Sequence, residues 1–96
     1  MINNINQISN PEEVKKKFKK YVGNDKAKLE LSEKSDKKYK VVHDGKTTHF
    51  GSTMQDYTKH KDETRRKSYL ARAKAIKGDW KSNKYSANNL AINLLW

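Results

Sequence analysis

The chain has 96 residues, of which 33% are hydrophobic and 34% charged, and its formal net charge is +11 at pH 7. This length allows one small domain, and the low apolar content excludes a large enzyme with a deep, dry active site. Because the chain has no cysteine, disulfides and thiolate metal sites are excluded as well. No apolar run approaches the ~18 residues of a membrane-spanning helix, and the first ten residues lack the basic and apolar regions of a secretory signal.

The positive charge is concentrated in the second part of the chain. Residues 1–36 carry 8 basic and 6 acidic side chains, whereas residues 37–96 carry 14 basic and 5 acidic ones. This excess favours a polyanionic partner such as nucleic acid, an acidic protein surface or anionic lipid. The alternative is the lysine bias of an A/T-rich genome, because only 3 of the 22 basic residues are arginines. With so few arginines, we expect contacts to phosphate rather than to base edges.

Residues 1–36 predict an N-terminal arm that contains one basic amphipathic helix. Residues 1–9 are polar and favour an irregular segment. The run from Asn10 to Glu13 begins a helix with a cap, a proline at the first helical position and two acids in the first turn, and Gly23 ends it. The surrounding lysines either form a solvated face or hold the helix against an anionic surface. The apolar stripe of this helix consists of Val14, Phe18, Tyr21 and Val22.

The following segments predict antiparallel strands. Residues 27–32 alternate between apolar and charged side chains, which favours a half-buried strand with its apolar residues on one side. In residues 39–50, the pair Asp44-Gly45 predicts a two-residue hairpin turn, because a type I′ turn needs positive φ at both central positions. This turn makes the following pairs on the core face: Tyr39 with Phe50, Val41 with Thr48, and His43 with Lys46.

The remaining residues predict two helices joined by loops. Residues 52–61 and 78–85 favour loops. The first helix is expected from Asp62-Glu63 to Lys77, and Ser86 caps the second. The fold class is therefore α+β: an N-terminal helix, a small antiparallel sheet of two to three strands, and two C-terminal helices on one face. Residues 37–96 are predicted to form the small basic domain. The helices are expected to bury Tyr69, Leu70, Ala73 and Ile76 in the first, and Leu90, Ala91, Leu94 and Leu95 in the second.

No arrangement of residues predicts catalysis, a cofactor or a metal. His43 and His49 fall on opposite faces of the hairpin and cannot share one ion. Asp56 and Asp62 flank His60, and a carboxylate could orient that imidazole, but capping and loop hydrogen bonds account for the same residues. The chain contains neither a glycine-rich phosphate loop nor a nucleophile elbow. We therefore expect a protein that is not an enzyme and that has no cofactor.

The basic side chains outside the predicted core are the candidate binding residues. Tyr57 and Tyr85, which lie in the predicted loops, are candidates for stacking on unpaired bases. Binding of nucleic acid or another polyanion is assigned to Lys15, Lys16, Lys19, Lys40, Lys46, Lys59, Lys61, Arg65, Arg66, Lys67, Arg72 and Lys74.

Three short motifs carry a resemblance to a known family. They are KKYKV (37–41), GKTTHFG (45–51) and DYTKHKD (56–62), followed by Arg65, Tyr69, Arg72, Trp80 and a final SA…LLW. With these residues, positions 37–96 resemble an uncharacterised family of short basic proteins encoded by large double-stranded DNA viruses of eukaryotes. The family usually has a histidine after the position of Arg72, where this chain has Ala73, and its final segment is richer in glycine and tryptophan.

The resemblance implies a viral source and no known activity. Together with the charge, it favours a virion structural protein, a minor capsid or cementing component, whose basic surface contacts acidic capsid protein or genome. The alternative is a nucleic-acid-binding protein without sequence preference. The expected partners are other virion proteins or nucleic acid within a larger assembly. The expected location is the virion, and the host cytoplasm or nucleus during infection.

Overall fold

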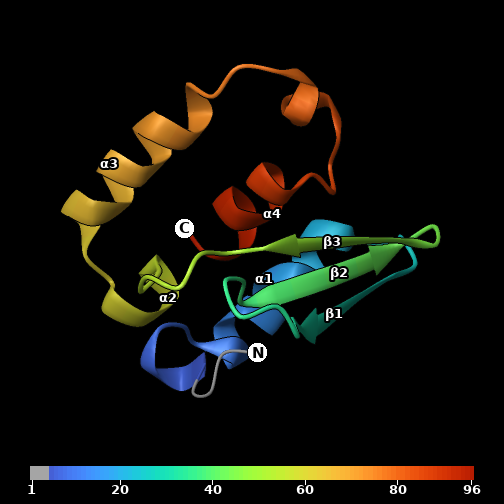
Figure 1. Cartoon of the computed structure of the whole chain (residues 1–96), viewed down its shortest axis with the longest axis horizontal. Coiled ribbons are helices and arrows are strands. Elements are labelled where there is room, and N and C mark those ends of the chain that lie inside the picture. The colour runs from blue at the N-terminus through green and yellow to red at the C-terminus, as the bar shows by residue number, and fades with distance from the viewer. Residues whose placement is uncertain (1–4) are drawn as a thin grey trace.

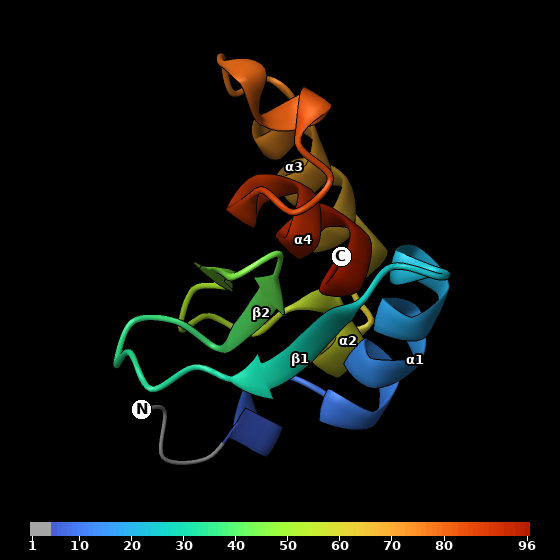
Figure 2. The same cartoon turned by 90° about the vertical axis from the view of Figure 1, so that its right-hand side faces the viewer.

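The computed structural model describes residues 5–96, which form a mixed α+β fold, as predicted (Figure 1). Helices α1 and α4 lie on one side of a three-stranded sheet, and α3 stands away from it (Figures 1 and 2). The predicted irregular arm falls partly outside the described residues, and its described part contains a short 3-10 helix. The elements in chain order are η1 (Ile5–Gln7), α1 (Pro11–Val22), β1 (Ala27–Leu31), β2 (Tyr39–His43), β3 (Lys46–Phe50), α2 (Tyr57–His60), α3 (Glu63–Lys74), η2 (Asp79–Ser82) and α4 (Ala87–Leu94).

The helix starts follow from local capping chemistry. The side-chain oxygens of Asn10, Asp62 and Ser86 accept hydrogen bonds from backbone N–H groups in the first turns of α1, α3 and α4. These N–H groups have no partner within their helices, so each cap satisfies donors that would otherwise be unpaired. Gly23, with φ of 57°, ends α1 through a hydrogen bond from its N–H to the carbonyl of Lys19. The predicted bounds of α1 and the predicted start of α4 are confirmed.

The sheet has the order β1-β2-β3, and both pairs are antiparallel. The hairpin between β2 and β3 has the predicted register, with Tyr39 opposite Phe50 and His43 opposite Lys46. Its turn residues Asp44 and Gly45 have φ of 51° and 73°, as a type I′ turn requires. Strand β1, which comes from the predicted N-terminal arm, pairs with β2 over its whole length. The two-residue turn therefore places β3 along one edge of β2, and the other edge of β2 pairs with β1.

One face of the sheet packs against α1 and α4, and the other face stays open. Side chains along each strand point alternately to the core face and to the open face. The open face carries charged and polar side chains such as Lys28, Lys40 and His49. Apart from Ala73 on α3, the buried apolar residues form one cluster: Val14, Phe18, Val22, Tyr39, Val41, Phe50, Leu90, Ala91, Leu94, Leu95 and Trp96. The core therefore depends on α1 and α4 as much as on the sheet.

A chain of buried polar groups joins β2, α2 and the segment before α1. The Tyr39 hydroxyl donates to Ser9 Oγ at 2.7 Å, and Ser9 Oγ lies 3.2 Å from Thr58 Oγ1, which donates to Asp56 Oδ1. Lys38 Nζ lies 3.3 Å from Asp56 Oδ2, as an ion pair rather than an aligned hydrogen bond. All five residues are buried. Burial lowers the pKa of Lys38, although the carboxylate of Asp56 opposes this effect. We refer to these residues as the buried polar joint.

Gly51 lies between Lys38 of the buried polar joint and Leu95, the residue that follows α4. Its φ is 86°, and a Cβ at this position would lie 3.0 Å from Leu95 Cδ1 and 3.1 Å from Lys38 Cβ. A glycine is therefore required here both by the backbone conformation and by the close approach of two side chains.

Several predicted details are wrong, each for a tertiary reason. Helix α3 ends at Lys74 rather than Lys77, so Ile76 has left the helix face that points toward α4 and is 53% exposed. The predicted side of Leu31 is confirmed by its pairing with Tyr39, but its side chain is 44% exposed at the end of the edge strand, beside a shallow groove of about 120 Å³. The predicted loops at residues 52–61 and 78–85 contain the short helices α2 and η2. No helix in residues 5–96 is long and apolar enough to cross a membrane.

Candidate polyanion interface

Helix α3 carries all three arginines of the chain. Ala73 is its one buried residue, so most of its surface is in contact with solvent. Figure 1 shows α3 projecting to one side, away from the sheet, and in Figure 2 it lies behind α4. The sequence explains why, because this helix has few apolar side chains, and of these Tyr69 and Leu70 are only partly buried against the core cluster. Five of the predicted binding residues therefore lie together on one projecting helix: Arg65, Arg66, Lys67, Arg72 and Lys74.

Most of these cations are available to an external anion. Arg65 lies 3.8 Å from the cap residue Asp62, but this pair is exposed and therefore weak. No acidic side chain within residues 5–96 lies at ion-pair distance from Lys67, Arg72 or Lys74. The surface of α3 thus carries positive charge that the described part of the chain does not neutralise.

Arg65 and Arg72 lie on the same side of α3. They are seven residues apart, which is about two helical turns or ~10 Å along the axis. Both line a groove of about 260 Å³, together with Ser68 and the apolar side chain of Met54. Met54 is 51% exposed. Two guanidinium groups therefore border one shallow depression, an arrangement suited to planar contacts with phosphate oxygens.

Arg66 has a structural role that the sequence did not predict. Its Nε donates to the backbone oxygen of Trp96 at 2.8 Å. Tyr69 stacks on the Trp96 indole, with ring centroids 4.2 Å apart, and His60 approaches the same indole from the side of α2, with centroids 5.2 Å apart. Burial lowers the pKa of His60, and the nearby Arg65 acts in the same direction. These contacts hold α3 in place against Trp96.

A second group of cations surrounds Tyr57 where α1, α2 and α3 meet. The ring centroid of Tyr57 lies 6.0 Å from Lys17 Nζ, 5.4 Å from Lys61 Nζ and 5.4 Å from the Arg66 guanidinium carbon. The tyrosine hydroxyl donates to Glu63 Oε1 at 2.8 Å, and this bond raises the pKa of Tyr57. Because cations occupy the space around the ring, Tyr57 is not placed as a free stacking platform.

The other predicted binding residues are spread over the molecule. Lys40 lies on the open face of the sheet, where its ion pair with Glu33 at 2.8 Å raises the pKa of Lys40. Lys46 is at the hairpin, and Tyr85 stacks on His43 with ring centroids 4.1 Å apart. Exposed side chains on α1, on α2 and directly after α2 complete the set: Lys15, Lys16, Lys19, Lys59 and Lys61, the last of which pairs with Glu13.

Two important lysines were missing from the sequence-based selection. Lys17 lies in the group around Tyr57, and its pKa is lowered by partial burial and by the charges of Lys61 and Arg66. Lys38 is buried with Asp56 and therefore cannot contact a partner. The sequence of α1 does not show that Lys17, among its other lysines, faces α2 and α3. No local pattern distinguishes Lys38 from Lys37 either.

The histidines and acids form no larger cluster. His43 contacts Tyr85 on the core face, whereas His49 Nδ1 lies 2.8 Å from Ser32 Oγ, so the two rings lie on opposite sides of the hairpin as predicted. Within residues 5–96, no three His, Asp or Glu side chains come close enough together to hold a metal ion.

Comparison with known proteins gives one match. Residues 27–73 match the model of a "Family of unknown function (DUF5754)". The matched segment includes the whole sheet, α2 and nearly all of α3, but neither α1 nor α4. No curated protein and no solved structure matches this chain. The matched segment contains the sheet and every residue of the buried polar joint except Ser9, and the family that it matches has no known function.

Proposed function

We propose that this protein binds nucleic acid through α3, mainly by contacts to phosphate and with little sequence preference. The observation that carries the proposal is the projecting helix with all three arginines, of which only Arg66 is engaged in packing. Guanidinium groups form paired hydrogen bonds with phosphate oxygens, and the neighbouring lysines add charge without strict geometry. The four cations that remain for a ligand are Arg65, Lys67, Arg72 and Lys74.

The aromatic side chains support duplex over single-stranded nucleic acid. Binding of single strands usually depends on bases stacking on free aromatic faces. Tyr57 is surrounded by cations, Tyr69 is stacked on Trp96, and Tyr85 is stacked on His43. Duplex phosphates require no such platform, so a helix of exposed cations suits them better.

The salt dependence of binding tests this proposal quantitatively. Each phosphate contact to duplex DNA contributes about −0.9 to the slope of log affinity against log salt, so four contacts predict a slope of about −3.6. The variant replaces Arg65, Lys67, Arg72 and Lys74 by glutamine, and fluorescence anisotropy with a labelled duplex gives the affinity between 50 and 200 mM salt, a range of about fourfold. We expect the slope to fall toward zero and the affinity at the lower salt concentration to drop more than tenfold.

A matched control variant tests whether the affinity depends on the cations of α3 or on the total charge of the protein. Lys20, Lys26, Lys28 and Lys34 are exposed lysines outside α3, and their replacement by glutamine removes the same four charges. The control variant should keep the slope and most of the affinity. Equal losses in both variants would show that binding follows total charge, and the assignment to α3 would then be wrong.

Incorporation into virus particles is a second proposal, and its support is the sequence resemblance together with the basic surface. As a minor capsid or cementing component, the protein would place its cations against acidic capsid protein or packaged genome. Mass spectrometry of purified particles would then find it at a reproducible copy number. Its absence from purified particles would eliminate this role, whereas the α3 variant tests nucleic-acid binding separately.

A further inference from the structure

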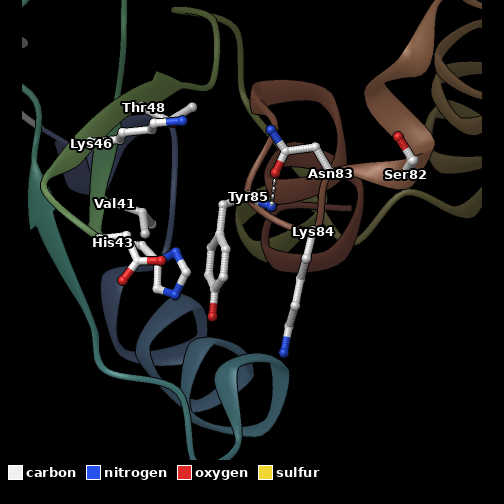
Figure 3. Close-up of a pocket in the computed structure, with 9 residues that line it drawn as sticks. Val41, His43, Lys46, Thr48, Ser82, Asn83, Lys84 and Tyr85 are labelled. Atoms are coloured by element: carbon white, nitrogen blue, oxygen red, sulfur yellow. Dashed lines mark hydrogen bonds between the residues drawn. The ribbon is translucent and has the colours of Figure 1, made fainter.

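A second polar groove lies at the hairpin end of the sheet, away from α3. It has a volume of about 450 Å³ and lies between the hairpin and the segment that leads into α4. Small-molecule sites commonly have volumes of roughly 300–1,000 Å³. Figure 3 shows side chains of the hairpin on one side and those of residues 82–85 on the other. The lining residues are Val41, His43, Asp44, Lys46, Thr48, Ser82, Asn83, Lys84 and Tyr85.

The segment that leads into the lining residues 82–85 is held by hydrogen bonds from α4. Asn89 Nδ2 on α4 donates to the carbonyl oxygens of Trp80 and Asn83 at 2.8 Å each. Asn83 Oδ1 in turn accepts a hydrogen bond from the Tyr85 backbone N–H at 3.0 Å, drawn as a dashed line in Figure 3. These bonds orient the Asn83 amide, because its oxygen is occupied and its NH₂ group is left to donate.

Other donors line the same groove. The ammonium of Lys46 has no acidic partner at ion-pair distance within residues 5–96, and the Thr48 hydroxyl makes no hydrogen bond to another side chain there. In Figure 3 the Lys46 side chain extends from the hairpin along the rim of the groove. Lys84 adds a cation that is shared with Asp25 at 3.0 Å, and Asp44 is the one acid in the lining.

We propose that this groove binds a small phosphate monoester, with the phosphate held by Lys46, Thr48 and the Asn83 amide. An ammonium, a hydroxyl and an amide NH₂ are all donors to phosphate oxygens. The partly exposed ring of Tyr85, which stacks on His43 in the same lining, gives the organic part of the ligand an apolar contact. This site is independent of the proposed α3 interface, because the two share no residue.

Nuclear magnetic resonance titration of the full chain tests this assignment with three probes: inorganic phosphate, adenosine 5′-monophosphate and adenosine. Inorganic phosphate and the monophosphate should shift the backbone amides of residues 46–48 and 82–85 saturably, and adenosine should shift them far less. Equal shifts with adenosine would overturn phosphate recognition. Shifts centred on α3 rather than on the groove would overturn the location.

Two substitutions identify the donors. Lys46→Gln removes the ammonium from an exposed position, and Asn83→Asp keeps the acceptor for the Tyr85 N–H while it replaces the NH₂ donor by a charged oxygen. Each should raise the Kd for the monophosphate at least tenfold, while the amide resonances of the core residues stay where they are in the unmodified protein. Lys28→Gln, an exposed charge-matched control, should leave the Kd unchanged. An unaltered Kd in both groove variants would overturn the proposal.

Two further arms separate the groove from α3 and identify the source of the phosphate. The α3 variant should bind the monophosphate as the unmodified protein does, so failure of the nucleic-acid proposal leaves this result intact. A short DNA duplex should shift α3 residues and not the groove. Groove shifts by the duplex at lower concentration than by the monophosphate would reassign the groove to nucleic-acid phosphates and overturn the small-ligand assignment.

Discussion

The buried ion pair between Lys38 and Asp56 gives the sharpest test of how this fold is stabilised. Their charged atoms lie 3.3 Å apart, and the two side chains are 1% and 0% exposed. Lys38→Met removes the ammonium and leaves the Asp56 carboxylate buried, with the Thr58 hydroxyl as its donor but without the cation that pairs with it. Loss of one partner from such a pair typically costs about 3–5 kcal/mol, because the remaining charge has lost its compensation.

This cost is large for a chain of 96 residues. At roughly 0.05–0.15 kcal/mol per residue, the total stability is about 5–14 kcal/mol. A loss of about 3 kcal/mol should lower the Tm by at least ~12 °C, since 1 kcal/mol corresponds to about 4–8 °C in domains of this size. Urea denaturation followed by tryptophan fluorescence measures the free energy of unfolding, and the exposed Lys28→Met is the matched control.

The double variant Lys38→Met with Asp56→Asn decides whether the charges are responsible. The asparagine keeps the size of the side chain and an oxygen that can accept from Thr58, while neither buried charge remains. We expect this variant to recover most of the stability that Lys38→Met loses. A loss below about 1 kcal/mol in the single variant, or purely additive losses in the double variant, would refute the interpretation of the joint as a coupled ion pair.

Three further predictions concern single residues. Gly51→Ala should destabilise the protein by more than Gly23→Ala does, because both have positive φ but only Gly51 meets a side chain, that of Leu95, within 3.0 Å; chemical denaturation measures both, and equal losses would contradict the steric argument. Burial raises the pKa of Tyr39 to about 12, so the neutral hydroxyl stabilises the fold below pH 10 and this contribution, up to about 3 kcal/mol, is lost as pH rises toward 12. When the pH is raised from 8 to 11, the free energy of unfolding should therefore fall by less for Tyr39→Phe than for the unmodified protein. An identical fall would argue against this cause. Asp62→Ala removes the cap of α3 and should cost about 1 kcal/mol. Relative to the unmodified protein, hydrogen exchange should become faster in α3 and stay unchanged in α1.

The match of residues 27–73 to a family of unknown function is easier to interpret with the structure at hand. Asp56 and Thr58 belong to the buried polar joint, Gly51 packs on Lys38, and His60 contacts Trp96. These residues also belong to the motifs that carried the sequence resemblance. Their positions explain the motifs as a structural joint between the sheet, α2 and α4.

Local chemistry made part of this protein predictable from sequence. The hairpin register follows from two residues, Asp44 and Gly45, because their turn type determines every pair along the strands. Caps such as Asn10 and Ser86 determined the helix starts in the same way, since their hydrogen bonds reach only three residues. Composition also favours a polyanionic partner for the basic surface, because net charge acts at long range, and this stays a prediction.

Only the tertiary structure decided which lysines are available to a partner. Lys37 and Lys38 are identical to any local pattern, yet Lys38 is buried because Asp56, eighteen residues later, folds back to meet it. The projection of α3, the role of Arg66 at Trp96 and the groove at the hairpin likewise depend on residues far apart in the chain. Burial and charge compensation are set by what lies nearby in space, and a linear pattern carries that information only for neighbours along the chain.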